Sequence, residues 1–246
     1  MLGLPAEIEA CLFDLDGVLT QTSTVHAAAW KETFDSFLQG RAAHAGTDFV
    51  PFGLVDDYRQ YVDGKPRADG VRSFLAARGI ALAEGDVDDP PAAETVHGLG
   101  NRKNELLRAR IRTTGVPVYE GSVRYVRAVK SAGLRRAVVS SSANTEEVLA
   151  TAGLAGLFDV RIDGVVAAQR GLRGKPAPDT FLAAASALGA EPAHAAVFED
   201  ALAGVEAGRA GGFGFVVGID RLGQADALRR SGADIVVGDL AELMRS

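Results

Sequence analysis

Short apolar runs rich in β-branched residues alternate with longer segments of helical periodicity in the second half of the chain. The apolar runs predict buried strands, and the segments between them predict helices. This alternation is typical of a parallel sheet that carries helices on both faces. The predicted strands cover residues 136–142, 158–162, 195–200, 213–219 and 234–237, and the predicted helices cover residues 121–132, 145–151, 178–188, 201–210 and 224–231.

Another apolar run precedes a pair of acidic residues near the N-terminus. The run begins at Cys11 and predicts a strand that ends in Asp14 and Asp16, with Gly17 directly after them. Residues two positions apart leave a strand on the same side, and ligands of open parallel sheets bind at the carboxyl ends of the strands. Two close carboxylates repel each other, so we expect a cation such as Mg²⁺ beside them. Taken alone, this segment is equally compatible with a solvated loop.

Residues 20–113 lack the strand pattern and are nearly all helical. We therefore predict an α/β fold with two domains. A Rossmann-like core with a parallel sheet takes residues 1–19 and 114–246, and an α-helical cap domain of residues 20–113 is inserted into it. The insert follows the strand that carries Asp14 and Asp16, so it is placed to act as a lid.

The hydrophobic spacing of the insert predicts four helices joined by polar loops. We expect the first helix to end at Gly40 and the last to break at Gly98 and Gly100. Arg67 is expected in the turn before the third helix. The predicted helices cover residues 22–38, 56–62, 69–78 and 92–113, and the predicted loops cover residues 41–47 and 85–91.

The composition narrows the classes of partner. The 246 residues carry a net charge of −6, from 32 acidic and 26 basic residues, which favours neither nucleic acid nor an anionic membrane as partner. The single cysteine, Cys11, provides neither a disulfide framework nor a thiolate metal site. The sequence shows no secretory signal pattern and no apolar run of membrane-spanning length, so a cytoplasmic location is the default expectation. An anionic substrate must therefore be held by a local basic cluster.

A run of small polar residues begins at the end of the predicted strand 136–142, directly after Val139. It reads Ser-Ser-Ser-Ala-Asn and supplies hydroxyl and backbone N–H groups just before a predicted helix, which is a suitable cradle for a phosphate. One of these residues could also simply cap the helix. The polar members are Ser140, Ser141, Ser142 and Asn144.

Two further connections carry charged side chains. Lys175 stands between Gly174 and a Pro-Ala-Pro corner, which restricts it more than an ordinary surface lysine. Glu199 and Asp200 end another predicted strand. Together with Asp14, these residues provide the carboxylates and the cation of a magnesium-dependent phosphoryl-transfer site.

These segments resemble the four ordered motifs of the haloacid dehalogenase superfamily of phosphotransferases. The first motif corresponds to residues 14–20, Asp-Leu-Asp-Gly-Val-Leu-Thr, and the second to Ser140. The third corresponds to Lys175 in Lys-Pro-Ala-Pro-Asp, and the fourth to Glu199 and Asp200. The matching order, spacing and strand-end placement cover the whole predicted core.

A narrower resemblance extends to the helical cap of the β-phosphoglucomutases. It rests on Gly64 with Arg67, on the segment Arg-Lys-Asn that contains Lys103, and on part of the first predicted helix. The Ser-Ser-Ser-Ala-Asn segment is also similar to that family's second motif. Without the resemblance, a helix-face histidine and a solvated loop arginine would be the simpler interpretations. The matching residues of the first helix are Thr22, His26, Trp30 and Lys31.

The resemblance implies a mechanism for the core. Asp14 would be the nucleophile that forms an aspartyl phosphate, and Asp16 would be the general acid and base. Ser140 and Lys175 would hold the oxygens of the transferring phosphoryl group. The resemblance also implies Mg²⁺ as cofactor, held by Asp14, the backbone carbonyl of Asp16, Asp200 and Glu199.

The resemblance implies a sugar phosphate as the small-molecule substrate. Arg67 would bind a second, non-transferring phosphate through its bidentate fork. Lys103 and His26 would position the sugar and Asp16 when the lid closes. The full set of implied substrate-binding residues is Thr22, His26, Trp30, Arg67, Lys103, Ser141, Ser142 and Asn144.

Three functions remain open at this point. The first is a mutase that interconverts β-glucose 1-phosphate and glucose 6-phosphate through a bisphosphate, and the second is a sugar-phosphate phosphatase of the same family. The third is a non-catalytic signalling domain that accepts phosphate on an aspartate, against which Asp16 and the inserted cap argue. The sequence departs from the mutase pattern between Phe34 and Arg67, with extra aromatic residues, and over residues 83–100. These departures affect the choice of sugar more than the chemistry.

Overall fold

The computed structural model describes residues 2–245, which form two compact units. The α/β unit contains residues 2–21, 64–66 and 116–245, and the helical unit contains Thr22–Asp63 and Arg67–Gly115. The short segment 64–66 thus belongs with the sheet although the helical segment surrounds it in sequence. Within the described range, every helix is too short or too polar to cross a lipid bilayer.

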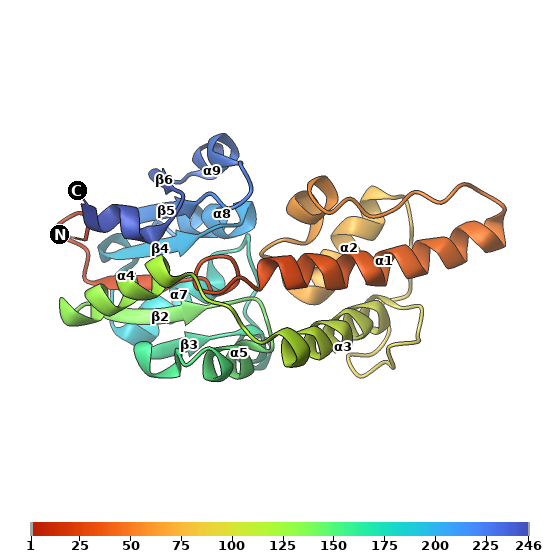
Figure 1. Cartoon of the computed structure of the whole chain (residues 1–246), viewed down its shortest axis with the longest axis horizontal. Helices are drawn as coiled ribbons and strands as arrows, with labels where there is room; N and C mark the ends of the chain where they lie inside the picture. The colour runs from red at the N-terminus through yellow and green to blue at the C-terminus, as the bar shows by residue number, and fades with distance from the viewer. Residues whose placement is uncertain (1, 246) are drawn as a thin grey trace. The chain divides into compact units, whose positions relative to one another are not determined.

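The α/β unit is built on a six-stranded sheet in the order β3-β2-β1-β4-β5-β6, and all its neighbouring strands are parallel (Figure 1). The predicted parallel α/β fold is confirmed. The chain order reverses around β1, and ligands of open α/β sheets bind at such a switch point. The strands are β1 (Ala10–Phe13), β2 (Arg135–Val139), β3 (Val160–Ile162), β4 (Ala195–Glu199), β5 (Phe215–Ile219) and β6 (Ile235–Val237).

Helices connect the strands largely where the sequence predicts them. Helix α5 agrees with its predicted bounds, and the others differ by a residue or two. Helix α6 was not predicted. Asp163 caps this helix by accepting from the backbone N–H groups of Val165 and Val166. The helices are α4 (Glu120–Ser131), α5 (Thr145–Thr151), α6 (Gly164–Arg170), α7 (Asp179–Leu188), α8 (Leu202–Ala210) and α9 (Ala225–Ser231), and 3₁₀ turns occur at Ala155–Leu157, Pro192–His194 and Leu240–Arg245.

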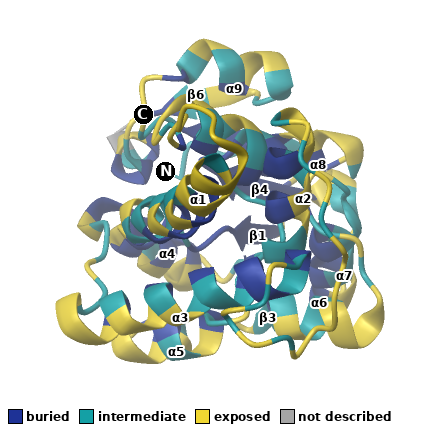
Figure 2. Ribbon diagram, turned by 90° about the vertical axis from the view of Figure 1, so that its right-hand side faces the viewer, coloured by how far each residue is buried: buried dark blue, intermediate teal, exposed yellow. Residues whose placement is uncertain are grey.

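The sheet is buried on both faces, as the strand composition predicts. Strands β1 and β4 are buried along their whole length (Figure 2). Leu12 faces an aliphatic cluster with Phe181 of α7, whereas the next residue, Phe13, faces the other side. There the Phe13 ring stacks on Phe198 at 4.4 Å between centroids and meets Tyr125 of α4 edge to face at 6.3 Å. This alternation fixes the register of β1 and β4, and with it the positions of the residues that follow each strand.

The helical unit has an aromatic core of its own. It contains α1 (Ser23–Ala45), a π-helical turn (Tyr58–Val62), α2 (Arg67–Ala77) and α3 (Val96–Thr114). The ring of Phe34 lies 5.0 Å from Trp30, 5.2 Å from Phe52 and 4.2 Å from Phe74, centroid to centroid. Phe52 and Tyr58, two of the aromatic residues that depart from the mutase pattern, are therefore part of this core.

Two glycine-based predictions in this unit are wrong. Helix α1 does not end at Gly40 but continues to Ala45, so part of the predicted loop 41–47 is helical, and the helix ends at Gly46 with φ 64°. Helix α3 is not broken at Gly98 or Gly100. A Cβ at Gly98 would lie 2.3 Å from the Ala93 carbonyl oxygen, so this glycine permits close packing and does not mark a helix end.

The start of α3 and the start of α2 also differ from prediction. Helix α3 begins at Val96, and its N-cap is Thr95, whose hydroxyl oxygen accepts from the Gly98 N–H at 2.9 Å. The residues before Thr95 thus form a longer loop than predicted. Helix α2 begins at Arg67, which places this residue on the helix and not in the preceding turn.

The two glycines around the end of α1 should respond oppositely to alanine. Gly40→Ala should stabilise the protein by about 0.5–1 kcal/mol, because a Cβ there meets nothing within 4 Å and alanine is the better helix former. Gly46→Ala should destabilise it by about 1–2 kcal/mol, because this position is left-handed. Thermal and urea unfolding of the two variants beside wild type measure this. Equal effects of the two substitutions would contradict the assigned helix end.

Candidate active site

Buried carboxylates gather at the carboxyl edge of the central strands. Asp14 directly follows β1, Glu199 ends β4 and Asp200 follows it. Because β1 and β4 are neighbours in register, each of the three residues has a carboxylate oxygen within 4.8 Å of the others. Their exposed fractions are 6%, 0% and 5% for Asp14, Glu199 and Asp200. Asp16, two residues beyond Asp14, is half-buried.

Lys175 lies inside this cluster. Its ammonium donates to Asp14 Oδ1 at 2.5 Å and to the Val139 carbonyl oxygen at 3.0 Å, and it pairs with Glu199 Oε1 at 2.5 Å. The residue is 2% exposed, so Lys175 is not an ordinary surface lysine, as its restricted place in the sequence suggests. The ammonium therefore joins the ends of β1, β2 and β4.

The pKa values reflect this crowding. Burial raises the pKa of Asp14 well above its ordinary value, and the charges of Glu199 and Asp16 add to the rise, whereas Lys175 opposes it. Burial disfavours the charged form of Lys175, but the carboxylates of Asp14 and Glu199 outweigh this and raise the pKa of the lysine. Lys175 therefore stays an ammonium, and further positive charge at the cluster would favour ionised Asp14.

The donor set fits a hard metal cation. Three carboxylates face one ammonium, which leaves an excess of negative charge that a divalent cation would balance. Two glycines make room for these side chains. A Cβ at Gly17, where φ is 92°, would lie 1.7 Å from Asp200 Oδ2, and a Cβ at Gly204 would lie 1.9 Å from Glu199 Oε1. The cluster can therefore hold a metal ion.

The serine segment lies beside this cluster at the end of β2. Ser140 is 2% exposed, and its N–H donates to the Ile162 carbonyl oxygen at 3.0 Å, which extends the sheet pairing by one residue. The Ser140 hydroxyl oxygen accepts from the Ser142 N–H at 3.1 Å, and the Ser142 hydroxyl oxygen accepts from the Asn144 N–H at 3.1 Å. These turns present successive hydroxyl groups at the same edge as Lys175.

Two other members of the segment differ from the simplest expectations. The Ser141 hydroxyl donates to the Gly64 carbonyl oxygen at 2.7 Å and so ties the segment 64–66 to the sheet. Asn144 holds the N-cap position of α5, but its side chain makes no capping hydrogen bond. Capping by Asn144 therefore does not explain this polar run.

Arg221 and Gln224, which follow β5, contribute to the site although no sequence motif marks them. Arg221 Nε donates to the Gly17 carbonyl oxygen at 2.9 Å, and its guanidinium lies 3.5 Å from the centroid of the Tyr119 ring. Gln224 Nε2 donates to the Asp200 carbonyl oxygen at 3.0 Å. Both side chains thus hold backbone that carries the site's carboxylates. Their position just after the carboxyl end of β5, at the same edge of the sheet as the acidic residues, could have indicated this role.

Helices α1 and α3 bring together three of the predicted substrate-binding residues. Lys103 Nζ lies 3.2 Å from His26 Nδ1 and 5.1 Å from the centroid of the Trp30 ring. Lys103 is 5% exposed, and Thr22, which precedes α1, is fully buried. The structure therefore gives His26 a definite polar neighbour and makes Lys103 part of a packed cluster.

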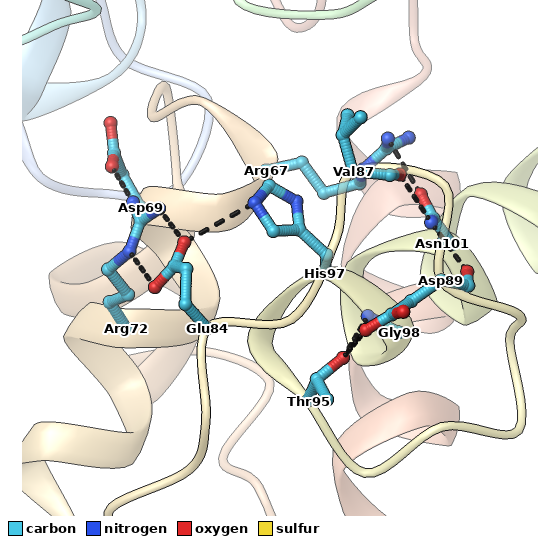
Figure 3. Close-up of polar contacts among 10 residues, drawn as sticks. All are labelled: Arg67, Asp69, Arg72, Glu84, Val87, Asp89, Thr95, His97, Gly98 and Asn101. Carbon is cyan, nitrogen blue, oxygen red and sulfur yellow. Dashed lines mark hydrogen bonds and ion pairs between the residues drawn. The ribbon is translucent and has the colours of Figure 1, made fainter.

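Arg67 has a separate environment at the start of α2. Its Nη2 donates to Asn101 Oδ1 at 3.0 Å (Figure 3). A Cβ at Gly100 would lie 3.2 Å from Arg67 Cγ, so the arginine runs close along α3. Burial lowers the pKa of Arg67, although a guanidinium remains charged at any physiological pH. Arg67 is thus a partly buried cation held by a neutral amide.

Comparisons with known proteins place these features in a family. The family model of haloacid dehalogenase-like hydrolases matches residues 8–212. A Mycobacterium tuberculosis protein named beta-phosphoglucomutase is 59% identical over 247 residues, which cover 99% of this chain and 94% of that protein.

Two solved structures extend the likeness. The β-phosphoglucomutase of Clostridium difficile superimposes with a TM-score of 0.73 at 25% identity, over 96% of this chain and 93% of that chain. A variant of CbbY from Rhodobacter sphaeroides in complex with xylulose-(1,5)bisphosphate gives a TM-score of 0.69 at 25% identity, over 96% of both chains. The chain belongs to the haloacid dehalogenase-like hydrolases and, within them, to the β-phosphoglucomutase-like proteins.

Proposed function

We propose that this protein is a Mg²⁺-dependent mutase that interconverts β-glucose 1-phosphate and glucose 6-phosphate through a sugar bisphosphate. The observation that carries the chemistry is the buried group of Asp14, Lys175, Glu199 and Asp200 at the sheet edge. The proposed substrate is inferred from the name of the 59% identical relative, beta-phosphoglucomutase. The bisphosphate is supported by the ligand of the CbbY structure.

In this proposal Asp14 is the nucleophile. A carboxylate oxygen of Asp14 attacks the phosphorus of the bisphosphate, the bond from phosphorus to the sugar oxygen breaks, and an aspartyl phosphate results. Lys175 already donates to Asp14 and, together with Ser140, would hold the phosphoryl oxygens as charge develops on them. The monophosphate product leaves, the free 6-hydroxyl of a β-glucose 1-phosphate attacks the phosphorus of the aspartyl phosphate, the bond from phosphorus to Asp14 breaks, and the bisphosphate forms again.

Asp16 would move the proton in both steps. It gives a proton to the leaving sugar oxygen, and the resulting carboxylate takes the proton of the attacking hydroxyl. Asp16 is half-buried, whereas Asp14 is buried beside Lys175, so the two carboxyl groups have different surroundings and can take different roles. Arg221 holds the Gly17 carbonyl directly after Asp16 and so restrains the loop that carries it.

We propose Mg²⁺ as the cation of the acidic cluster. Asp14, Asp200 and the backbone carbonyl of Asp16 would hold it, and when bound it would neutralise charge between the nucleophile and the phosphate. Glu199 would act mainly as a support, because its Oε1 pairs with Lys175 and its Oε2 accepts from the N–H groups of Asp200 and Ala201 at 3.1 Å and 3.2 Å.

The helical unit would be the cap that selects the substrate and excludes water. Arg67 would bind the phosphate that is not transferred, and Lys103 with His26 would position the sugar and Asp16. Thr22 and Trp30 would complete the substrate-binding set: the Thr22 carbonyl oxygen accepts from the His26 N–H at 2.8 Å, and the Trp30 ring lies 5.1 Å from Lys103 Nζ. Exclusion of water from the aspartyl phosphate is what distinguishes a mutase from a phosphatase with the same residues.

Mutase activity predicts how products appear. With Mg²⁺, β-glucose 1-phosphate and a trace of glucose 1,6-bisphosphate, glucose 6-phosphate should appear well ahead of free phosphate in parallel assays. Release of free phosphate without formation of glucose 6-phosphate would contradict the mutase and indicate a sugar-phosphate phosphatase. If neither appears and the protein also leaves p-nitrophenyl phosphate intact, phosphoryl transfer itself is contradicted.

Removal of the acid and base should separate the two half-reactions. Asp16→Ala should lower turnover of β-glucose 1-phosphate by about 10²–10⁴-fold, because the sugar oxygen is a poor leaving group without a proton. With p-nitrophenyl phosphate, whose leaving group needs little protonation, the variant should release a burst of p-nitrophenol and then stall. Stopped-flow absorbance detects the burst, and Asp14→Asn, which lacks the nucleophile, should show none. Wild-type turnover of both esters by Asp16→Ala would contradict the assigned role.

Displacement of Glu199 should weaken the metal site. In Gly204→Ala the new Cβ would lie 1.9 Å from Glu199 Oε1, so the carboxylate must move, and affinity for Mg²⁺ should fall about 10- to 100-fold. Isothermal titration calorimetry with Mg²⁺ measures the affinity. Gly208→Ala on the same helix is the matched control, because its Cβ meets Val197 and Val216 at 3.3 Å and reaches no carboxylate. If a folded Gly204→Ala protein binds Mg²⁺ as tightly as wild type, Glu199 does not contribute to the metal site.

A further inference from the structure

We infer that Asn101 is the residue that positions Arg67, and that through it the loop of residues 83–95 sets how the protein recognises the second anionic group of its substrate. This inference rests on the proposed function, which gives Arg67 the non-transferring phosphate. It concerns a residue of α3 that no motif marks and a loop that departs from the mutase pattern.

The amide of Asn101 has one possible orientation. Its Nδ2 donates to the Val87 carbonyl oxygen at 2.9 Å and to the Asp89 carbonyl oxygen at 2.8 Å. Both partners are acceptors only, so the NH₂ group must face the loop and the carbonyl oxygen Oδ1 must face the other way. Oδ1 accepts from Arg67 Nη2 at 3.0 Å (Figure 3). The loop backbone therefore dictates where the acceptor for Arg67 lies.

The loop is itself held at several points. The Thr95 hydroxyl donates to Asp89 Oδ2 at 2.6 Å, and the Val96 N–H donates to the Ala83 carbonyl oxygen at 3.0 Å. A Cβ at Gly85, where φ is 73°, would lie 2.1 Å from Asp89 Oδ2, so the loop closes tightly on this side chain. The two carbonyl groups that Asn101 uses thus belong to an ordered turn and not to a loose strand.

The loop is also joined to both neighbouring helices. Glu84 forms an ion pair with Arg72 of α2, and its Oε1 lies 3.3 Å from His97 Nε2 on α3 (Figure 3). Arg72 pairs in turn with Asp69. These contacts place the loop across the ends of α2 and α3, which carry Arg67 and Asn101.

The chemistry of the pair suits an arginine that must bind a ligand. A guanidinium has five N–H donors in a planar fork, and Asn101 accepts from one of them, which fixes the plane of the fork. An amide leaves the positive charge of Arg67 intact, whereas a carboxylate at this position would neutralise it. Gly100 allows the Arg67 side chain to lie close to α3. The contact with Asn101 therefore orients Arg67 through a neutral group.

Two substitutions of Asn101 separate its effect on the orientation of Arg67 from an effect on the charge of Arg67. Asn101→Ala removes the acceptor, and the affinity for glucose 1,6-bisphosphate should fall about 10-fold, because Arg67 is no longer held in the binding geometry. Asn101→Asp keeps an acceptor for Arg67 but adds a negative charge and loses the donors to Val87 and Asp89, so the affinity should fall at least as far. The affinity for inorganic phosphate, which has no second anionic group, should change much less in both variants.

Isothermal titration calorimetry with Mg²⁺ present measures both ligands, and KM for β-glucose 1-phosphate should rise in parallel. The comparison includes Arg67→Ala and the double variant Asn101→Ala/Arg67→Ala. If Asn101 acts through Arg67, the two losses are not additive, and the double variant binds the bisphosphate like Arg67→Ala alone.

The outcomes separate this inference from the proposed function. Additive losses, equal losses for bisphosphate and inorganic phosphate, or wild-type affinity of Asn101→Ala while Arg67→Ala is impaired would overturn the role of Asn101 alone. If Arg67→Ala binds the bisphosphate as tightly as wild type, the proposed role of Arg67 fails, and the inference fails with it.

Discussion

The α/β unit depends on one buried ammonium among three buried carboxylates. A carboxylate taken out of water is costly unless it is paired, and Lys175 provides the pairing for Asp14 and Glu199 at 2.5 Å each. One lysine does not balance three acids. The remaining negative charge makes the cluster unfavourable by itself and favourable for a divalent cation.

The topology of the sheet makes this arrangement possible. Asp14 and Glu199 are far apart in sequence but follow neighbouring parallel strands, and the stacking of Phe13 on Phe198 fixes the register between them. Side chains after β5 then hold the backbone of the two acidic loops, since Arg221 donates to the Gly17 carbonyl and Gln224 to the Asp200 carbonyl. The carboxylates are thereby positioned by backbone contacts, which leaves their oxygens for ligands.

Sequence reasoning brought together residues that lie at strand ends and was weaker where position depends on packing. Asp14, Glu199 and Asp200 could be predicted to lie together because parallel strands bring their carboxyl ends to one edge, whereas Lys175 lies between α6 and α7 and reaches the cluster through its side chain. Glycines misled, because the same residue can end a helix, as Gly46 does, or permit close packing inside one, as Gly98 does, and only tertiary neighbours distinguish the two. Asn101 gave no signal, because its position depends on two backbone carbonyl groups of a loop and on one contact with Arg67 of another helix.

The two units use their cations in different ways. The charge of Lys175 is shared with the protein's own carboxylates, which keeps the lysine protonated and Asp14 oriented. In the helical unit, Arg67 is held by the neutral amide of Asn101. Arg72 in the same unit pairs with carboxylates. A cation held by a neutral amide keeps its attraction for an anion, so this contact distinguishes Arg67 from Arg72, whose charge is already paired within the helical unit.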